Sequence, residues 1–157
     1  MLKIIQAKPN PLGKDKFGRN IIPELQLAGE WIDIKNEGDS GVHLNGLKIY
    51  HLAYKVDNTE LDKVFEFDFG DKDVLLSKQV LRLHSGGFIP ENGLLEIDRI
   101  GADHHVFTGK NYIWNNDKID KPGIWNPRLE KWVDQTWYDS YPPDGVILKR
   151  NNGKLVP

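Results

Sequence analysis

The segment Glu30-Trp31-Ile32-Asp33-Ile34-Lys35-Asn36-Glu37-Gly38 alternates apolar and polar residues and then ends in Asn, Glu and Gly. This pattern is typical of a half-buried antiparallel β-strand that runs into a turn, because successive side chains of a strand point to opposite faces. Ile32 and Ile34 are therefore expected to face a core, whereas Asp33 and Lys35 are expected to face water. The segment predicts a sheet with one apolar face.

Further strand-like segments surround this one. Residues 42–49 repeat the same period and contain an Asn-Gly turn signal. In a later segment Phe65, Phe67 and Phe69 alternate with acidic residues, which predicts three aromatic side chains on one face of a strand. The residues expected to be largely buried are Ile32, Ile34, Leu44, Ile49, Phe67 and Leu83. Short strands at close spacing predict an all-β sandwich.

The second half of the chain adds four short strand candidates. Residues 94–97 and 105–107 are apolar enough for strands of their own. Residues 146–148 and 155–156 flank an Asn152-Gly153 pair, which is a strong signal for a β-hairpin.

One segment, about 117–143, differs from the rest in its high density of aromatic residues. Within it, Asn126 and Pro127 match a helix N-cap followed by proline at the first helical position. A short amphipathic helix is therefore predicted from about Pro127 to about Tyr138. Its apolar stripe, with helical spacing, consists of Leu129, Trp132, Val133 and Trp137. We expect this stripe to face the sandwich, because an isolated helix this short is marginal in water and needs tertiary packing.

Composition limits the classes of protein to consider. The chain has 157 residues, a net charge of -2 and no cysteine. This length predicts a single domain over residues 1–157, and the absence of cysteine excludes disulfides and thiolate metal sites. We expect no membrane span and, because the start lacks the features of a signal peptide, a cytoplasmic protein. A secreted or envelope protein whose export signal had been removed would show the same start.

The order of several motifs resembles the lamin tail domain, the immunoglobulin-like sandwich of nuclear lamins and many bacterial proteins. The segments that are similar to the family pattern are Asn10-Pro11-Leu12-Gly13-Lys14-Asp15, Gly29–Asn36, Val42–Ile49, Val80–Gly86, Trp114-Asn115-Asn116 and Asp144–Leu148. Leu47 stands where the family usually has Trp. The resemblance implies an immunoglobulin-like β-sandwich of the lamin tail type, with the 117–143 segment as a helical insertion, and a binding or structural role rather than a reaction.

Residues that could carry chemistry are present but do not form a recognisable set. Asp103, His104 and His105 with His84 could supply zinc ligands, yet adjacent strand residues point to opposite faces. Ser85 lacks the Gly-x-Ser-x-Gly elbow of a nucleophile, and no glycine-rich loop has a P-loop ending. We therefore predict no catalytic, metal or cofactor-binding residues.

Three functional hypotheses remain. The first is a non-catalytic interaction or structural module with a protein partner. The second is a carbohydrate- or nucleic-acid-binding sandwich that uses the aromatic residues of the 117–143 segment, and the third is a metal-assisted hydrolase. Trp125, Tyr138 and Tyr141 lie off the predicted apolar stripe or beyond the predicted helix, so they are the predicted contacts with a partner.

Overall fold

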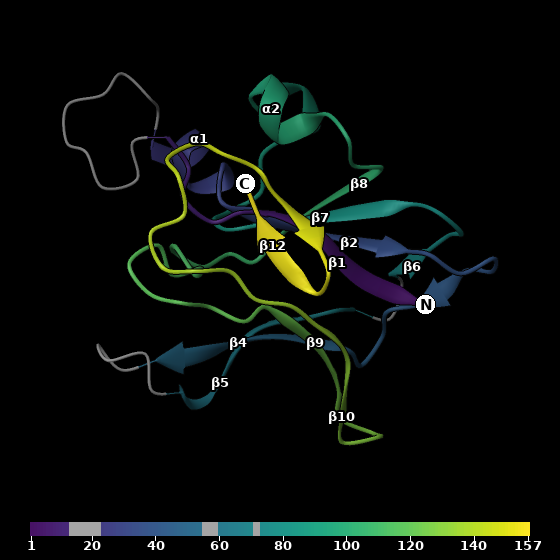
Figure 1. The fold of residues 1–157 in the computed structure, drawn as a ribbon. Coiled ribbons are helices and arrows are strands. Elements are labelled where there is room, and N and C mark those ends of the chain that lie inside the picture. Colours follow the sequence, from purple (N-terminus) through teal and green to yellow (C-terminus); the bar gives the residue numbers. More distant parts are fainter. Residues whose placement is uncertain (13–22, 55–59, 71–72) are drawn as a thin grey trace.

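A computed structural model describes residues 1–12, 23–54, 60–70 and 73–157. In this part of the chain, strands dominate and form a six-stranded, a four-stranded and a two-stranded sheet. Figure 1 shows the six-stranded and four-stranded sheets as two layers, one above the other. Buried apolar residues of both sheets belong to one core cluster, so the core lies between the layers. The Gly13–Asp15 part of the first motif lies outside the described residues.

The six-stranded sheet contains both ends of the described chain. Its neighbouring strands are antiparallel, except that the last pair, β7 and β8, is parallel. In spatial order the strands are β12 (Lys154–Val156), β11 (Leu148–Asn151), β1 (Leu2–Lys8), β2 (Trp31–Asn36), β7 (Val80–His84) and β8 (His104–Phe107). The opening segment of the sequence is thus β2, an inner strand of the larger sheet.

The four-stranded sheet is antiparallel throughout and packs below the first layer in Figure 1. Its spatial order is β10 (Lys131–Gln135), β9 (Gly123–Asn126), β4 (Lys48–Tyr54) and β5 (Glu60–Asp68). The two-stranded sheet pairs β3 (Val42–His43) with β6 (Val74–Leu75).

The predicted core is confirmed with one exception. Ile32, Ile34, Leu44, Ile49 and Leu83 are at most 1% exposed, whereas Phe67 is partly buried at the edge of the core. The prediction that three phenylalanines share one face is wrong, because Phe65 is 41% exposed and Phe69 is 3% exposed. Ile49 and Tyr50 are consecutive residues of β4, but their partners on β5, Phe67 and Phe65, are two residues apart. Glu66 is therefore the extra residue of a β-bulge, which interrupts the alternation of faces.

The predicted helix over residues 127–138 is wrong, because this segment forms the β9–β10 hairpin. Trp125 pairs with Trp132 across the two strands. The Asn126 side chain accepts hydrogen bonds from the backbone N–H groups of Arg128 and Leu129, at 3.0 and 3.2 Å, as an N-cap would. Here those bonds close a turn, and Glu130 leaves it with a φ of 47°. A cap signal therefore fixes the start of the turn without fixing a helix.

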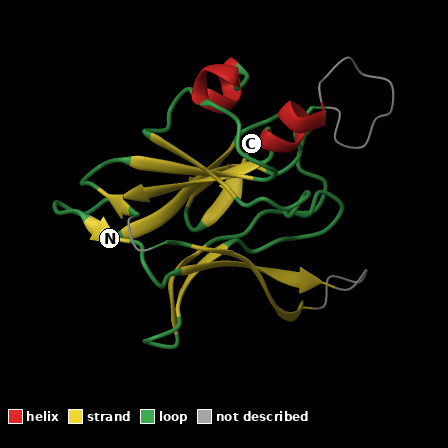
Figure 2. Cartoon of the chain, turned by 180° about the vertical axis from the view of Figure 1, so that it is seen from behind, coloured by secondary structure: helices red, strands yellow, loops and turns green. Residues whose placement is uncertain are grey.

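Two short α-helices in the described residues lie on the outer side of the six-stranded sheet, away from the other layer (Figures 1 and 2). They are α1 (Pro23–Ala28) and α2 (Glu96–Arg99), the latter preceded by the 3-10 turn η1 (Glu91–Gly93). The predicted strand over residues 94–97 is therefore wrong, whereas the one at 105–107 is confirmed as part of β8. No helix among the described residues is long and apolar enough to cross a membrane.

The segments that cover the outer face of the six-stranded sheet change the environment of Asp33, which was expected to face water. Asp33 is 1% exposed, and Arg82 of the neighbouring strand donates two hydrogen bonds of 2.7 Å to its carboxylate. The Arg82 guanidinium also lies 3.6 Å from the centre of the Trp31 ring. Both faces of the six-stranded sheet are therefore partly buried, one in an apolar core and the other in a charged layer.

The C-terminal hairpin is confirmed. Asn151 pairs with Lys154, which leaves Asn152 and Gly153 as a two-residue loop. Both loop residues have positive φ values, 48° and 84°. A two-residue loop with this geometry matches the right-handed twist of its strands.

The buried Arg82–Asp33 pair predicts a large loss of stability when one partner is removed. Arg82→Ala should lower the free energy of unfolding by about 3–5 kcal/mol, because Asp33 would remain buried without its cation. Chemical denaturation measures this loss. Lys3→Ala is the control, since Lys3 pairs with Glu37 at the surface, at 3.0 Å, and should cost less than about 1 kcal/mol. Equal losses for the two variants would contradict the prediction.

Candidate functional site

The outer face of the four-stranded sheet carries a group of aromatic and lysine side chains, which we call the aromatic–lysine face. The strand register places its members on neighbouring strands, since Tyr50 pairs with Phe65, Trp132 with Trp125, and Lys48 with Trp125. Ile49 and Ile124, their neighbours in sequence, point into the core. The alternation of each strand therefore sends these rings outward. The members of the face are Tyr50, Phe65, Trp125, Trp132, Lys48 and Lys63.

The rings of this face pack edge-to-face. The centres of Trp125 and Trp132 are 5.0 Å apart with the planes inclined by 73°. Tyr50 joins the group at 6.2 Å from Trp132 and 5.6 Å from Phe65. Such contacts contribute about 0.5–1.5 kcal/mol per pair beyond the buried area, so the rings hold one another in place.

A glycine determines where Trp132 lies. The Trp132 ring covers Gly123 so closely that a Cβ atom there would be only 2.6 Å from the ring carbon Cζ3. Any larger residue at this position would displace the indole. The face is therefore shaped by backbone as well as by side chains.

Lysine ammonium groups lie over these rings. Lys63 Nζ is 4.6 Å from the centre of the Trp125 ring, and Lys48 Nζ is 5.1 Å from that of Phe65. Lys110 Nζ, from the loop after β8, also lies 5.1 Å from the centre of the Phe65 ring. Cations at these distances interact favourably with aromatic faces. The face therefore combines apolar area with positive charge.

The three predicted contact residues do not lie together. Trp125 belongs to the aromatic–lysine face and is half-buried. Tyr138 is 1% exposed and donates a 2.7 Å hydrogen bond to the Asn115 carbonyl, so it is a core residue and not a surface contact. Tyr141 is 77% exposed, but it lines a separate hollow beside the C-terminal strand β12.

The predicted roles of the stripe residues are corrected as well. Leu129 is 60% exposed and Val133 is 36% exposed, while Trp132 lies on the outer face instead of facing the sandwich.

Sequence reasoning did not include Tyr50 and Phe65 as site residues. For Tyr50 the available signal was its alternation with Ile49, which places an aromatic residue on the strand face away from the core. Phe65 gave no such signal, because regular alternation groups it with Phe67 and only the bulge at Glu66 moves it to the outer face.

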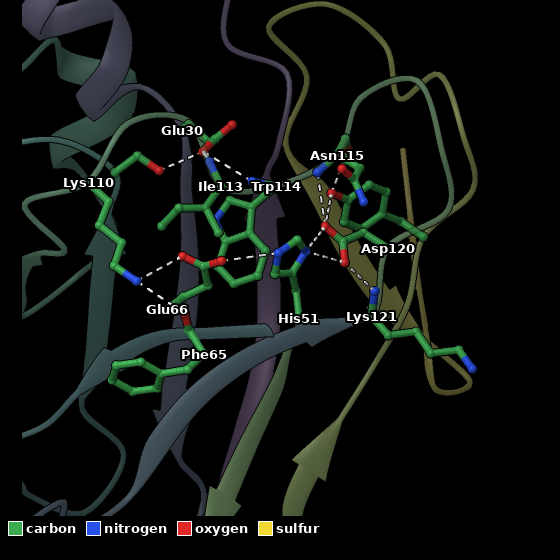
Figure 3. A network of polar contacts seen from close by, with 12 residues as sticks. Glu30, His51, Phe65, Glu66, Lys110, Ile113, Trp114, Asn115, Asp120 and Lys121 are labelled. Carbon is green, nitrogen blue, oxygen red and sulfur yellow. Dashed lines mark hydrogen bonds and ion pairs between the residues drawn. The ribbon is translucent and has the colours of Figure 1, made fainter. Parts of the chain in front are cut away.

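A network of polar contacts, drawn in Figure 3, lies between the layers and is centred on His51 of β4. His51 Nδ1 is 2.9 Å from Asp120 Oδ2, and His51 Nε2 is 3.2 Å from Glu66 Oε1. The bulge at Glu66 turns this carboxylate toward the histidine. Lys110 Nζ reaches the other Glu66 oxygen at 3.4 Å. The group therefore joins the four-stranded sheet to the segment that carries Lys110 and Asp120.

Burial and ion pairing act in opposite directions on His51. Burial disfavours the charged ring, but hydrogen bonds and charges from Asp120 and Glu66 outweigh it and raise the pKa of His51 to about 9. The ring is therefore an imidazolium at neutral pH, with both nitrogens engaged. A general base needs a ring nitrogen that can reach a substrate, whereas both nitrogens of His51 are held by carboxylates of the protein itself. The geometry fits a structural cross-link.

Of the three histidines considered as zinc ligands, two lie side by side and the third points elsewhere. His84 Nε2 lies 2.9 Å from His105 Nδ1, while His104 turns to Gln79 on the other side of the strand. Burial lowers the pKa of His84 to about 3, so this ring is neutral at physiological pH. Among the described residues, no group of three or more His, Cys, Asp or Glu side chains could hold a metal ion. Ser85 donates to the buried Glu30 carboxylate at 2.6 Å, and this bond uses its hydroxyl proton.

No protein-family model matches this sequence, and no curated protein is significantly similar to it. The resemblance to lamin tail domains therefore remains a prediction.

The raised pKa of His51 predicts a pH-dependent stability. In the unfolded chain an unperturbed histidine has a pKa of about 6.5. The contribution of the charged ring is thus complete below pH of about 6.5 and is lost as the pH rises through about 9, the folded-state value. The corresponding loss is about 3 kcal/mol.

The difference in unfolding free energy between wild type and His51→Gln, measured by urea denaturation from pH 6 to 10, should shrink over this interval. His43→Gln, at an exposed histidine, is the control and should follow wild type at every pH. A difference that is independent of pH would contradict the assignment of charge to His51.

Proposed function

We propose that this chain is a non-catalytic binding module and that the aromatic–lysine face is its binding surface. The observation that carries the proposal is the difference between the two outer faces. Helices and loops cover the six-stranded sheet, whereas the outer face of the four-stranded sheet presents Phe65 at 41% exposure beside half-buried Tyr50, Trp125 and Trp132. Aromatic residues at such positions are the usual anchors of protein interfaces.

We further propose that the sandwich is of the immunoglobulin-like, lamin tail type. The support is the order of the motifs and the places they occupy. Gly29–Asn36 leads into and forms β2, Val42–Ile49 covers β3 and the start of β4, and Val80–Gly86 contains β7. Each of these segments supplies residues to the common core. A lamin-tail-like domain is compatible with a role in interaction and not in catalysis.

A protein with an acidic, partly apolar surface is the partner that the face fits best. Lys63 lies over Trp125, and Lys48 and Lys110 lie near Phe65, so cations already occupy positions over the rings. A flat sugar or base that stacked on Trp125 would have to displace Lys63. Carboxylates of a partner could instead approach the ammonium groups while apolar side chains contact the ring edges. The net charge of -2 also gives no general attraction to nucleic acid.

A carbohydrate or single-stranded nucleic acid is the second candidate. The observation in its favour is the combination of lysines with aromatic rings on one sheet face, which is how many single-strand-binding surfaces are built. Quenching of tryptophan fluorescence by oligothymidine or by soluble oligosaccharides would support this candidate over a protein partner.

The binding proposal predicts a specific loss of partner capture. Purified wild type, Trp125→Ala and Tyr141→Ala would be immobilised and exposed to a nuclease-treated lysate of the source organism, and bound proteins would be identified by mass spectrometry. A partner should bind wild type and Tyr141→Ala alike. It should bind Trp125→Ala at least about 10-fold more weakly, because removal of an interface anchor costs about 2 kcal/mol or more.

Circular dichroism of the three proteins controls for folding, and Lys63→Glu provides a second test of charge at the same place. A partner that binds all variants equally would show that the aromatic–lysine face is not the binding surface. The same capture from an untreated lysate is the comparison, and binding that is seen only without nuclease treatment would move the nucleic-acid candidate ahead.

A further inference from the structure

A cavity of about 270 Å³ lies on the other side of the molecule, beside α1 and α2. Its walls are mainly apolar, and the side chains that matter here are those of Pro11, Leu12, Leu25, Leu95 and Ile97. This volume is just below the usual range of small-molecule sites, about 300–1,000 Å³. The cavity can therefore hold a small apolar molecule, and it is separate from the aromatic–lysine face.

Asp98 of α2 lines this cavity and is only 1% exposed. Its Oδ1 atom accepts hydrogen bonds from the Lys8 ammonium group and from Trp31 Nε1, the latter at 2.8 Å. Its Oδ2 atom is buried and has no hydrogen-bond partner within the described part of the chain. Buried carboxylate oxygens are nearly always satisfied, so an unpartnered one beside a cavity indicates a missing donor.

Gly29 lies beside this oxygen, and any side chain at this position would crowd it. A Cβ atom on Gly29 would lie 3.3 Å from Asp98 Oδ2 and 3.2 Å from the Pro11 Cβ atom. All three residues line the cavity. The glycine, the proline and the unpartnered oxygen therefore meet at one end, where the cavity is polar.

The charges around Asp98 select the kind of donor. Lys8 already pairs with the carboxylate, and Arg82 Nη1 donates to the Asp98 carbonyl oxygen at 3.0 Å. A second ammonium group at Oδ2 would lie close to both cations and be repelled, whereas Asp144, the other carboxylate that lines the cavity, already has an interaction of its own. A neutral hydroxyl group can donate one hydrogen bond to Oδ2 without this repulsion.

We propose that this cavity binds a small aliphatic alcohol whose hydroxyl group donates a hydrogen bond to Asp98 Oδ2. The hydrocarbon part fills the space between the leucine, isoleucine and proline side chains, and the hydroxyl group supplies the donor that the protein lacks. The site is independent of the binding surface proposed above.

Three probes of similar shape test the chemistry. Cyclohexanol carries the donor, methoxycyclohexane keeps the oxygen without a donor, and cyclohexylammonium replaces the hydroxyl group by a cation. Each would be titrated into the ¹⁵N-labelled protein and followed by amide chemical shifts. Cyclohexanol should give saturable shifts at Gly29 and Asp98 and bind at least 10-fold more tightly than either of the other probes. Equal or tighter binding of methoxycyclohexane or cyclohexylammonium, or no saturable shifts with cyclohexanol, would overturn the proposal.

Two matched variants test the location. Ile97 and Ile100 are both exposed, at 47% and 57%, so tryptophan at either position should be tolerated by the fold. Both residues line a shallow hollow beside Ile147, but only Ile97 also lines the cavity. Ile97→Trp should weaken cyclohexanol binding at least 10-fold, and Ile100→Trp should leave it unchanged. Weakening by both variants would place the alcohol in the hollow, and weakening by neither would place it elsewhere; either result overturns the proposal.

Discussion

The bidentate ion pair between Arg82 and Asp33 is the contact on which the covered side of the molecule depends. It links β2 to β7 across the outer face of the larger sheet, where both side chains are almost completely buried. The same guanidinium donates to the carbonyl oxygens of Asp98 and Ile100, at 3.0 and 3.1 Å. One side chain thus connects two strands and the segment that covers them. An unpaired buried charge is costly, so the ion pair between the strands is stable only while the segment that carries Asp98 and Ile100 stays packed over it.

This arrangement makes the two layers unlike each other. The larger sheet has an apolar inner face and a charged, covered outer face, whereas the smaller sheet carries partly exposed rings and lysines on its outer side. Bulges add polar contacts between the layers. Glu66 turns inward to His51, and Asp134, next to the β10 irregularity, accepts a 2.8 Å hydrogen bond from the backbone of Ile4 in the facing sheet. Charged groups as well as apolar side chains therefore hold the layers together.

The asymmetry also separates the two binding sites that we propose. The aromatic–lysine face is broad and partly exposed, and it suits a macromolecular surface. The cavity beside Asp98 is small and apolar with one polar end, and it suits a small molecule. The His51 group lies between them in the interior and is saturated by its own partners. In the part of the chain that the structure describes, these three places are separate, and each has its own set of polar groups.

The sequence by itself determined the strand β2, the strand at 105–107, the Asn-Gly hairpin and most of the core. Each of these follows from contacts between residues close in the chain or from a period of two along one strand. Tertiary structure decided the rest. Residues 127–138 have apolar positions that fit a helix, but pairing of Trp132 with Trp125 and of β9 with β4 makes them a hairpin. Asp33 alternates like a surface residue, yet it is buried because α2 and Arg82, distant in sequence, cover it. Local periodicity specifies which face of a strand a side chain occupies, but only packing of distant segments decides whether that face meets water.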